Sequence, residues 1–179
     1  MEAIDRLRTT AESHRRIMVV ETMGRHAGWI ACESGMASSA DYILVPEEPV
    51  DVQKMIHVIK ARRAAGKMYG IVVVSEGAQI TPDDGFVTQN AKIDEFGHVS
   101  LGGVGELVAE IIEKHTGFET RTVILGHLQR GGSPTTFDRL LALRFGAAAV
   151  RLIEEENYGH MVALIGGRMV PVSIEQAIK

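Results

Sequence analysis

The chain has 179 residues, 45% of them apolar and 23% charged, an ordinary composition for one globular domain or for one domain and part of a second. A net charge of −4 without any block of five or more Lys and Arg excludes the usual signature of a nucleic-acid partner, and no apolar run reaches membrane-spanning length. The lone Cys32 excludes an intrachain disulfide framework and a cysteine zinc cluster, and we expect a cytoplasmic protein.

Short apolar runs alternate with amphipathic helical segments along the chain. In chain order we expect a helix over 2–12, a strand over 17–20, a helix over 27–38, a strand over 42–45, a helix over 51–65, a strand over 71–74, a helix over 104–115, a strand over 122–125, a helix over 136–156 and a strand over 161–165. Apolar strands that alternate with helices predict an α/β fold, a three-layer sandwich with a mainly parallel sheet.

Residues 78–103 interrupt this alternation and are rich in Asp, Gly and Thr, which predicts a long loop or an excursion with short strands. A helical pattern is already under way at Glu2. Another has capping-box spacing from Ser173 and stops at Lys179 after a turn or two. We therefore expect an N-terminally truncated fragment of a longer protein.

The most informative stretch is 126–134, Gly-His-Leu-Gln-Arg-Gly-Gly-Ser-Pro, between the strand over 122–125 and the helix that begins near Thr136. Its glycines let backbone N–H groups approach a ligand, the helix N-terminus favours negative charge, and Arg130 can bind a phosphate through two N–H groups. The sequence therefore predicts a site for a phosphorylated small molecule.

Two other loops at the carboxyl ends of predicted strands carry polar residues, Met-Gly-Arg at 23–25 and Ser-Glu-Gly at 75–77. Ligands of open α/β sheets bind at this edge. Taken singly, Arg25 is more readily explained as an ordinary loop cation, and Glu76 as a helix-cap partner, than as site residues. If the strands are neighbours, however, four side chains suited to a phosphate and to sugar hydroxyls converge: Arg25, Glu76, His127 and Arg130.

Arg16 and Arg121 lie at the opposite, amino ends of two predicted strands. A site at the carboxyl edge of the same chain could not easily use them. They are either solvated charges where the strands begin or contacts to a ligand held by a neighbouring subunit.

Together these loops resemble those of the phosphofructokinase family. Residues 19–25, Val-Val-Glu-Thr-Met-Gly-Arg, look like the family's sugar-phosphate loop, and residues 121–134, with Asp138 and Arg139 behind them, look like its signature. The match runs in order over essentially all 179 residues. Residues 94–105 look like the insertion of actinobacterial and mixed ATP/pyrophosphate members.

The resemblance implies a fructose 6-phosphate site. Six residues would bind this substrate directly: Met23, Gly24, Arg25, Glu76, His127 and Arg130. Of these, Arg25 and Arg130 would also take part in catalysis. Arg16 and Arg121 would reach across an interface to the phosphate of a substrate in the adjacent subunit, which implies a homo-oligomer, commonly a tetramer. Asp41 matches an acidic position near the family's effector site.

The family's Gly-Gly-Asp nucleotide loop and its Thr-Ile-Asp-Asn-Asp motif, whose first aspartate is the base, do not occur in the 179 residues. The resemblance thus implies part of a glycolytic 6-phosphofructokinase, which transfers a phosphoryl group from ATP or pyrophosphate to the 1-hydroxyl of fructose 6-phosphate. Mg²⁺ would accompany the donor, with its ligands in the missing half. The fragment alone is not expected to catalyse.

By the same resemblance, residues 1–132 would form the substrate-binding domain, residues 133–165 would cross to a nucleotide-binding domain, and residues 166–179 would return towards the substrate domain. Apolar side chains of the crossing segment would then be exposed: Leu140, Leu141, Leu143 and Phe145.

Two alternatives remain open. One is a non-enzymatic sugar-phosphate-binding or regulatory module that kept the acceptor loops, and the other is an α/β anion binder unrelated to kinases. Coding sequence upstream of Met1 that contains both missing motifs would decide for the enzyme.

Overall fold

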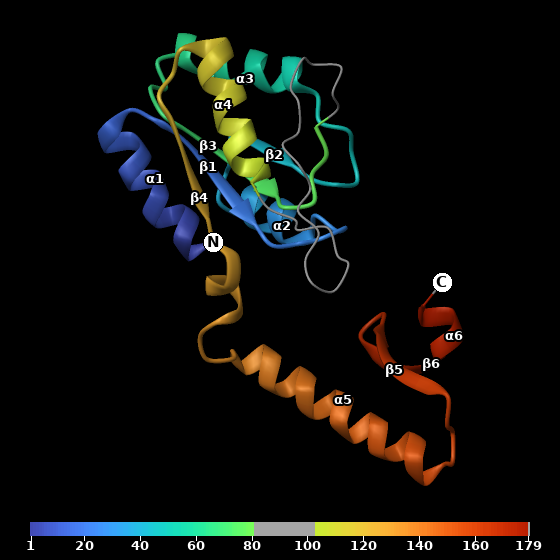
Figure 1. Ribbon diagram of the computed structural model, residues 1–179. Helices are drawn as coiled ribbons and strands as arrows, with labels where there is room; N and C mark the ends of the chain where they lie inside the picture. Colours follow the sequence, from blue (N-terminus) through green and yellow to red (C-terminus); the bar gives the residue numbers. More distant parts are fainter. Residues whose placement is uncertain (81–102, 179) are drawn as a thin grey trace. The chain divides into compact units, whose positions relative to one another are not determined.

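The computed structural model describes residues 1–80 and 103–178 and divides the chain into two compact units, Met1–Arg130 and Gly131–Lys179 (Figure 1). The first unit contains α1 (Glu2–His14), β1 (Ile17–Thr22), α2 (Trp29–Ala37), β2 (Tyr42–Leu44), α3 (Val52–Ala64), β3 (Gly70–Ser75), α4 (Val104–Thr116), β4 (Thr120–Ile124) and the 3-10 helix η2 (Gly126–Arg130). The second contains α5 (Thr136–Glu154), β5 (His160–Ile165), β6 (Arg168–Ser173) and α6 (Ile174–Ala177). The long loop expected over 78–103, and the insertion-like stretch over 94–105, lie mostly outside the described residues.

Four parallel strands form the sheet of the first unit, in the order β2-β3-β1-β4. The central strand β1 has Ile17 in register with Gly70 of β3 on one side and with Thr120 of β4 on the other. Because all the strands run the same way, the carboxyl ends of β3, β1 and β4 meet at one edge, where their loops are neighbours.

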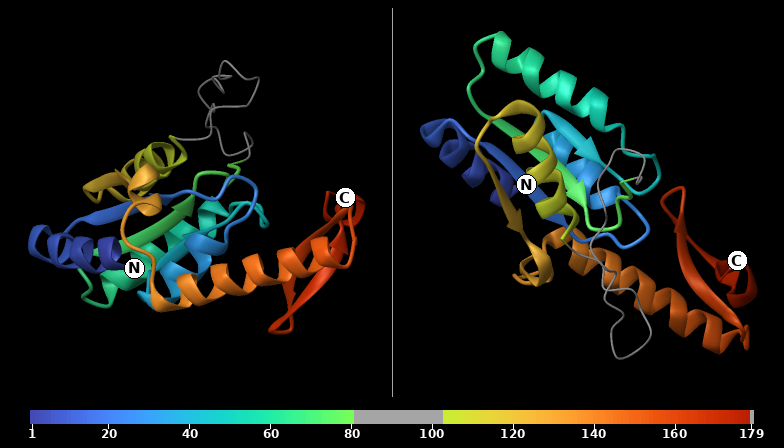
Figure 2. Two further views of the ribbon diagram at one scale, coloured as in Figure 1. Left: turned by 90° about the horizontal axis from the view of Figure 1, so that it is seen from below. Right: turned by 45° about the horizontal axis from the view of Figure 1, so that its top comes forward.

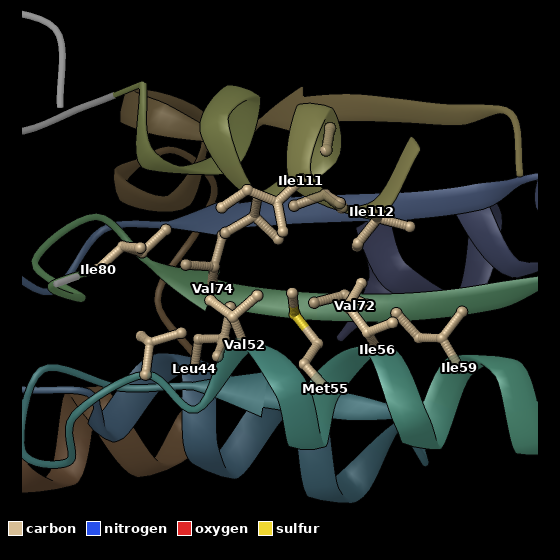
Figure 3. Packing of buried hydrophobic residues seen from close by; sticks show 14 of the residues in the cluster. Leu44, Val52, Met55, Ile56, Ile59, Val72, Val74, Ile80, Ile111 and Ile112 are labelled. Carbon is tan, nitrogen blue, oxygen red and sulfur yellow. The ribbon is translucent and has the colours of Figure 1, made fainter. Parts of the chain in front are cut away.

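Helices cover both faces of this sheet (Figure 2). Both β1 and β3 are buried along their whole length, and successive side chains point to opposite faces. On one face α3 and α4 pack over Val72 and Val74 (Figure 3), and on the other α1 and α2 pack over Ile71 and Val73. The predicted three-layer α/β sandwich with a parallel sheet is confirmed.

Helix ends are fixed by local chemistry that is readable in the sequence. The carboxylate of Asp51 accepts a hydrogen bond from the N–H of Lys54 at 2.8 Å and begins α3. Thr135 and Asp138 form a capping box that begins α5. Gly117, with a φ of 70°, ends α4 and turns the chain into β4.

The second unit contains a strand that the sequence analysis did not predict. β5 and β6 form an antiparallel pair joined by Gly166 and Gly167, whose φ angles are 57° and 79°. A two-residue hairpin turn of this kind needs both central residues in the left-handed region, which glycine reaches without strain. The Gly-Gly pair between two apolar runs was therefore an available signal for β6.

Among the residues described, no helix is both long enough and apolar enough to cross a membrane.

Candidate functional site

Side chains that follow the two neighbouring strands hold the loop after β1. The backbone N–H groups of Gly24 and Arg25 donate hydrogen bonds to Oε1 of Glu76, after β3, at 3.2 and 3.1 Å. The N–H of Met23 donates to Oε1 of Gln129, after β4, at 2.9 Å. The structure thus brings together at one sheet edge the three loops that the sequence placed at strand ends.

Arg25 has a strained backbone within this loop. Its φ is 44°, in the left-handed region that residues with a side chain rarely adopt. Gly77 lies so close that a Cβ on it would meet the carbonyl oxygen of Arg25 at 1.5 Å. The turn after β3 therefore fits against the turn after β1 only if residue 77 has no side chain. A strained residue held by its surroundings is typical of ligand-binding loops.

The 3-10 helix η2 separates its side chains into two sets. Side chains three residues apart in a 3-10 helix lie on the same face, which groups His127 with Arg130. Both residues are exposed, whereas Gln129 is half-buried and bonded to the loop after β1. The role of Gln129 is not readable in the sequence, because its partner Met23 is 106 residues away in the chain.

The cluster offers two guanidinium groups, an imidazole and a carboxylate at the carboxyl edge of the sheet. Arg25, His127 and Arg130 are exposed and Glu76 is half-buried. Arginine binds phosphate through paired N–H groups, and a carboxylate accepts hydrogen bonds from hydroxyls. The edge is chemically suited to a molecule that carries both a phosphate and hydroxyl groups.

Glu21 is a buried carboxylate near this edge that sequence reasoning did not single out. It is 2% exposed, and its Oε2 accepts a hydrogen bond from the N–H of Gly105 at the start of α4 at 2.8 Å. Burial raises the pKa of Glu21, and the charge of Glu76 acts in the same direction, while the bond from Gly105 opposes them. An acidic residue inside an otherwise apolar strand was the signal in the sequence.

Arg16 and Arg121 lie at the other, amino edge of the sheet and not with these loops. Their Nη2 atoms both contact Oε1 of Glu119, at 2.8 and 2.7 Å. The hydrogen bond from Arg16 lowers the pKa of Glu119, and the charges of Arg16, Arg121 and His14 lower it further. One carboxylate oxygen therefore holds two guanidinium groups a few ångströms apart.

Asp41, near the same edge, is engaged within the fold. Its Oδ2 accepts a hydrogen bond from the N–H of Ile71 at 2.7 Å, and its carboxylate forms an ion pair with Arg62. The adjoining hollow has a volume of about 10 Å³, room for a single water molecule. Arg63 lies over the ring of Phe118, 4.1 Å from its centre.

Within residues 1–80 and 103–178, no three His, Cys, Asp or Glu side chains are grouped so that they could hold a metal ion.

A family model and the curated relatives of this chain point to the same protein family. The phosphofructokinase family model matches residues 1–153. A pyrophosphate–fructose 6-phosphate 1-phosphotransferase of Streptomyces coelicolor is 53% identical over 98% of this chain and 51% of its own length. An ATP-dependent 6-phosphofructokinase of Corynebacterium efficiens is 45% identical over 99% of this chain and 51% of its own. The chain thus spans about half the length of these curated relatives.

Solved structures agree with this assignment. A phosphofructokinase of Saccharomyces cerevisiae matches with a TM-score of 0.82 and 34% identity, over 99% of this chain and 22% of the yeast chain. A pyrophosphate-dependent phosphofructokinase of Nitrosospira multiformis matches with a TM-score of 0.73 and 25% identity, over 97% of this chain and 44% of its own. The family model covers well over half of the residues of this chain, and the chain therefore belongs to the phosphofructokinase family.

Proposed function

We propose that this chain is the fructose 6-phosphate-binding part of a 6-phosphofructokinase. The whole enzyme transfers a phosphoryl group from ATP or pyrophosphate to the 1-hydroxyl of its sugar-phosphate acceptor. The observation that carries the proposal is the meeting of three loops at one sheet edge, with the N–H groups of Met23, Gly24 and Arg25 bonded to Gln129 and Glu76. Relatives of similar identity are named for either donor, so the donor is ATP or pyrophosphate.

The acceptor is held, in this proposal, by the residues of the three loops. Arg25, His127 and Arg130 bind the anionic groups, and the two arginines also offset negative charge that develops during phosphoryl transfer. Glu76 uses Oε1 for two backbone N–H groups, so Oε2 is the oxygen assigned to a sugar hydroxyl. Met23 and Gly24 contribute backbone that approaches the sugar. These residues orient the acceptor, which is the main contribution of a protein to this chemistry.

Arg16 and Arg121 bind, in this proposal, the phosphate of an acceptor held by an adjacent copy, so the enzyme is a homo-oligomer. The proposal is supported by the way Glu119 holds both side chains at the amino edge. Each guanidinium has five N–H groups. Arg121 also uses Nη1 to donate a hydrogen bond to the carbonyl oxygen of Thr120, and the N–H groups that remain suit a second anion.

The roles of the chain's segments follow the same proposal. Residues 1–132 form the substrate-binding domain, residues 133–165 cross to a nucleotide-binding domain, and residues 166–179 return. The nucleotide loop, the aspartate base and the residues that bind Mg²⁺ belong to the other half of the enzyme, so this chain binds the acceptor and does not catalyse alone.

Calorimetric titration of the chain with fructose 6-phosphate tests the proposal. Arg130→Ala and Arg25→Ala each remove a charge-assisted contact of about 1.5–3 kcal/mol, so each should weaken binding roughly ten- to a hundredfold. Arg151→Ala, at an exposed position of α5, is the matched control and should leave the affinity unchanged. Unchanged affinity in both test variants would overturn the site assignment.

A further inference from the structure

The loop after β1 presents three consecutive backbone N–H groups, and two different side chains accept their hydrogen bonds. Glu76 accepts from Gly24 and Arg25, while the bond from Met23 goes to Gln129 at 2.9 Å. The direction of each N–H group is set by the oxygen that accepts its hydrogen bond. The position of the loop therefore depends on acceptors from both sides.

Gln129 lies at a distinctive place on η2. Its neighbours Leu128 and Arg130 are exposed, whereas Gln129 is half-buried against the loop after β1. Because side chains three residues apart share a face of a 3-10 helix, His127 and Arg130 point together while Gln129 projects elsewhere. The same short helix thus carries two exposed cationic or polar side chains on one face and, on another, an anchor to the neighbouring loop.

Glutamine also suits this position chemically. Its side-chain oxygen accepts the hydrogen bond of Met23 without adding a negative charge near Arg25 and Arg130. A carboxylate here would make the same bond but would lower the local positive potential. Leucine has a similar size and offers no acceptor.

We propose that Gln129 is a positioning residue for ligand binding. By holding the N–H of Met23 it fixes the loop of β1 to η2, so that Arg25 and the face carrying His127 and Arg130 keep one arrangement before the ligand arrives. Such preorganisation raises affinity because the loops need not be ordered on binding. This inference rests on the proposed function, since the ligand it serves is the phosphorylated sugar.

The first measurement concerns the ligand-free chain and is independent of the proposed function. Amide hydrogen exchange of Met23, followed by NMR, reports its hydrogen bond directly. Gln129→Leu should speed this exchange at least about tenfold, since protection requires the bond, while amides in the middle of β1 keep their rates. Gln129→Glu, which retains an acceptor, should keep Met23 protected. Gln53→Leu, at an exposed position of α3, is the matched control.

The second measurement is the affinity of the same variants for fructose 6-phosphate. A lost hydrogen bond of about 0.5–1.5 kcal/mol predicts a weakening of roughly two- to tenfold for Gln129→Leu and none for Gln53→Leu. The proposal is overturned if the exchange of Met23 is unchanged in Gln129→Leu, if protection is lost throughout β1, or if Met23 is freed without weaker binding. A wild-type chain that binds no sugar phosphate would instead overturn the proposed function, and with it the role of Gln129 in binding, while the exchange data still report on the bond to Met23.

Discussion

Two glutamates at opposite edges of the sheet have side-chain pKa values that are shifted in opposite directions by their surroundings. Glu21 is buried at the carboxyl edge, and burial raises its pKa. Glu119 is exposed at the amino edge, and its hydrogen bond from Arg16 lowers its pKa. Since pKa shifts are linked to folding, the two carboxylates should change stability with pH in opposite directions.

Glu119→Gln should remove a contribution to stability that exists only while the carboxylate is ionised. The folded pKa lies below the ordinary value of 4.5, so this contribution is present above pH 4.5 and is lost as pH falls through the lower folded value. The variant should therefore be less stable than wild type at pH 7, and the difference should shrink in acid. Urea unfolding at pH 7 and pH 3.5 measures it, with the exposed Glu33→Gln as control. A difference that grows in acid would contradict the assignment.

Gly77→Ala should disturb the loop after β1. The new Cβ would lie 1.5 Å from the carbonyl oxygen of Arg25, so the two turns must separate. Overpacking of this kind costs about 1–3 kcal/mol, and we expect fructose 6-phosphate affinity to fall as Arg25 moves. Gly146→Ala is the matched control, because a Cβ there meets nothing within 4 Å. Thermal unfolding and calorimetry check both variants, and a Gly77→Ala protein with wild-type affinity would show that the close approach is unimportant.

At the scale of elements, the helix α4 depends on a residue of β1. Glu21 accepts the hydrogen bond of Gly105 at the N-terminus of α4, where backbone N–H groups lack partners within the helix. Gly105 also approaches closely, since a Cβ on it would lie 3.0 Å from Glu21 Oε2 and from Thr122 Cγ2. The strand therefore fixes where the helix begins on the sheet.

Replacing Glu21 separates its hydrogen bonding from its charge. Glu21→Ala leaves a buried N–H without its acceptor and should cost about 1–3 kcal/mol, whereas Glu21→Gln keeps an acceptor and should cost less. Because the folded pKa is raised, the stability that Glu21 contributes is fully present below pH 4.5 and is lost as pH rises through the folded value. Urea unfolding at pH 4 and pH 8 should thus show wild type losing stability relative to Glu21→Gln at the higher pH. Equal differences at the two pH values would mean that Glu21 has an ordinary pKa.

Most elements of the first unit could be predicted from sequence because each has a local signal. The run Ile17–Val20 is apolar because both faces of β1 are covered, and Gly117 is where α4 ends. β6 was not predicted, although Gly166 and Gly167 indicate the turn that joins it to β5. The role of Gln129 could not be read, because it depends on a contact between residues 106 positions apart. The sequence predicted that the three loops lie at one edge of the sheet. It did not predict the hydrogen bonds between them.

On the scale of the whole molecule, the two units differ in burial. The first has two cores, one on each face of its sheet. Among the described residues of the second, 131–178, none is buried, and large apolar side chains are exposed on α5. Leu140 and Leu143, which were expected to be exposed, are 57% and 70% exposed, whereas Leu141 and Phe145 are partly covered.

The second unit should therefore exchange its amide hydrogens much faster than the sheet of the first. Helices gain most of their stability from packing of an apolar face, and α5 has no buried residue. Hydrogen exchange followed by mass spectrometry of the whole chain should show peptides from 136–154 exchanging at least about a hundredfold faster than peptides from β1 and β3. Equal protection in both regions would mean that α5 is covered in solution, for example by another copy of the chain.

The order of the strands also sets the timing of folding during synthesis. β1 is made first and lies at the centre, but Glu76 follows Gly24 by 52 residues and Gln129 follows Met23 by 106. At a translation rate of about 5–20 residues per second, the second anchor leaves the ribosome roughly 3–10 s after the first. Until then one side of β1 has no partner strand. The nascent chain thus passes through a period in which the loop after β1 is held on one side only, and a chaperone or a ligand that acts in that interval meets an incomplete cluster of loops.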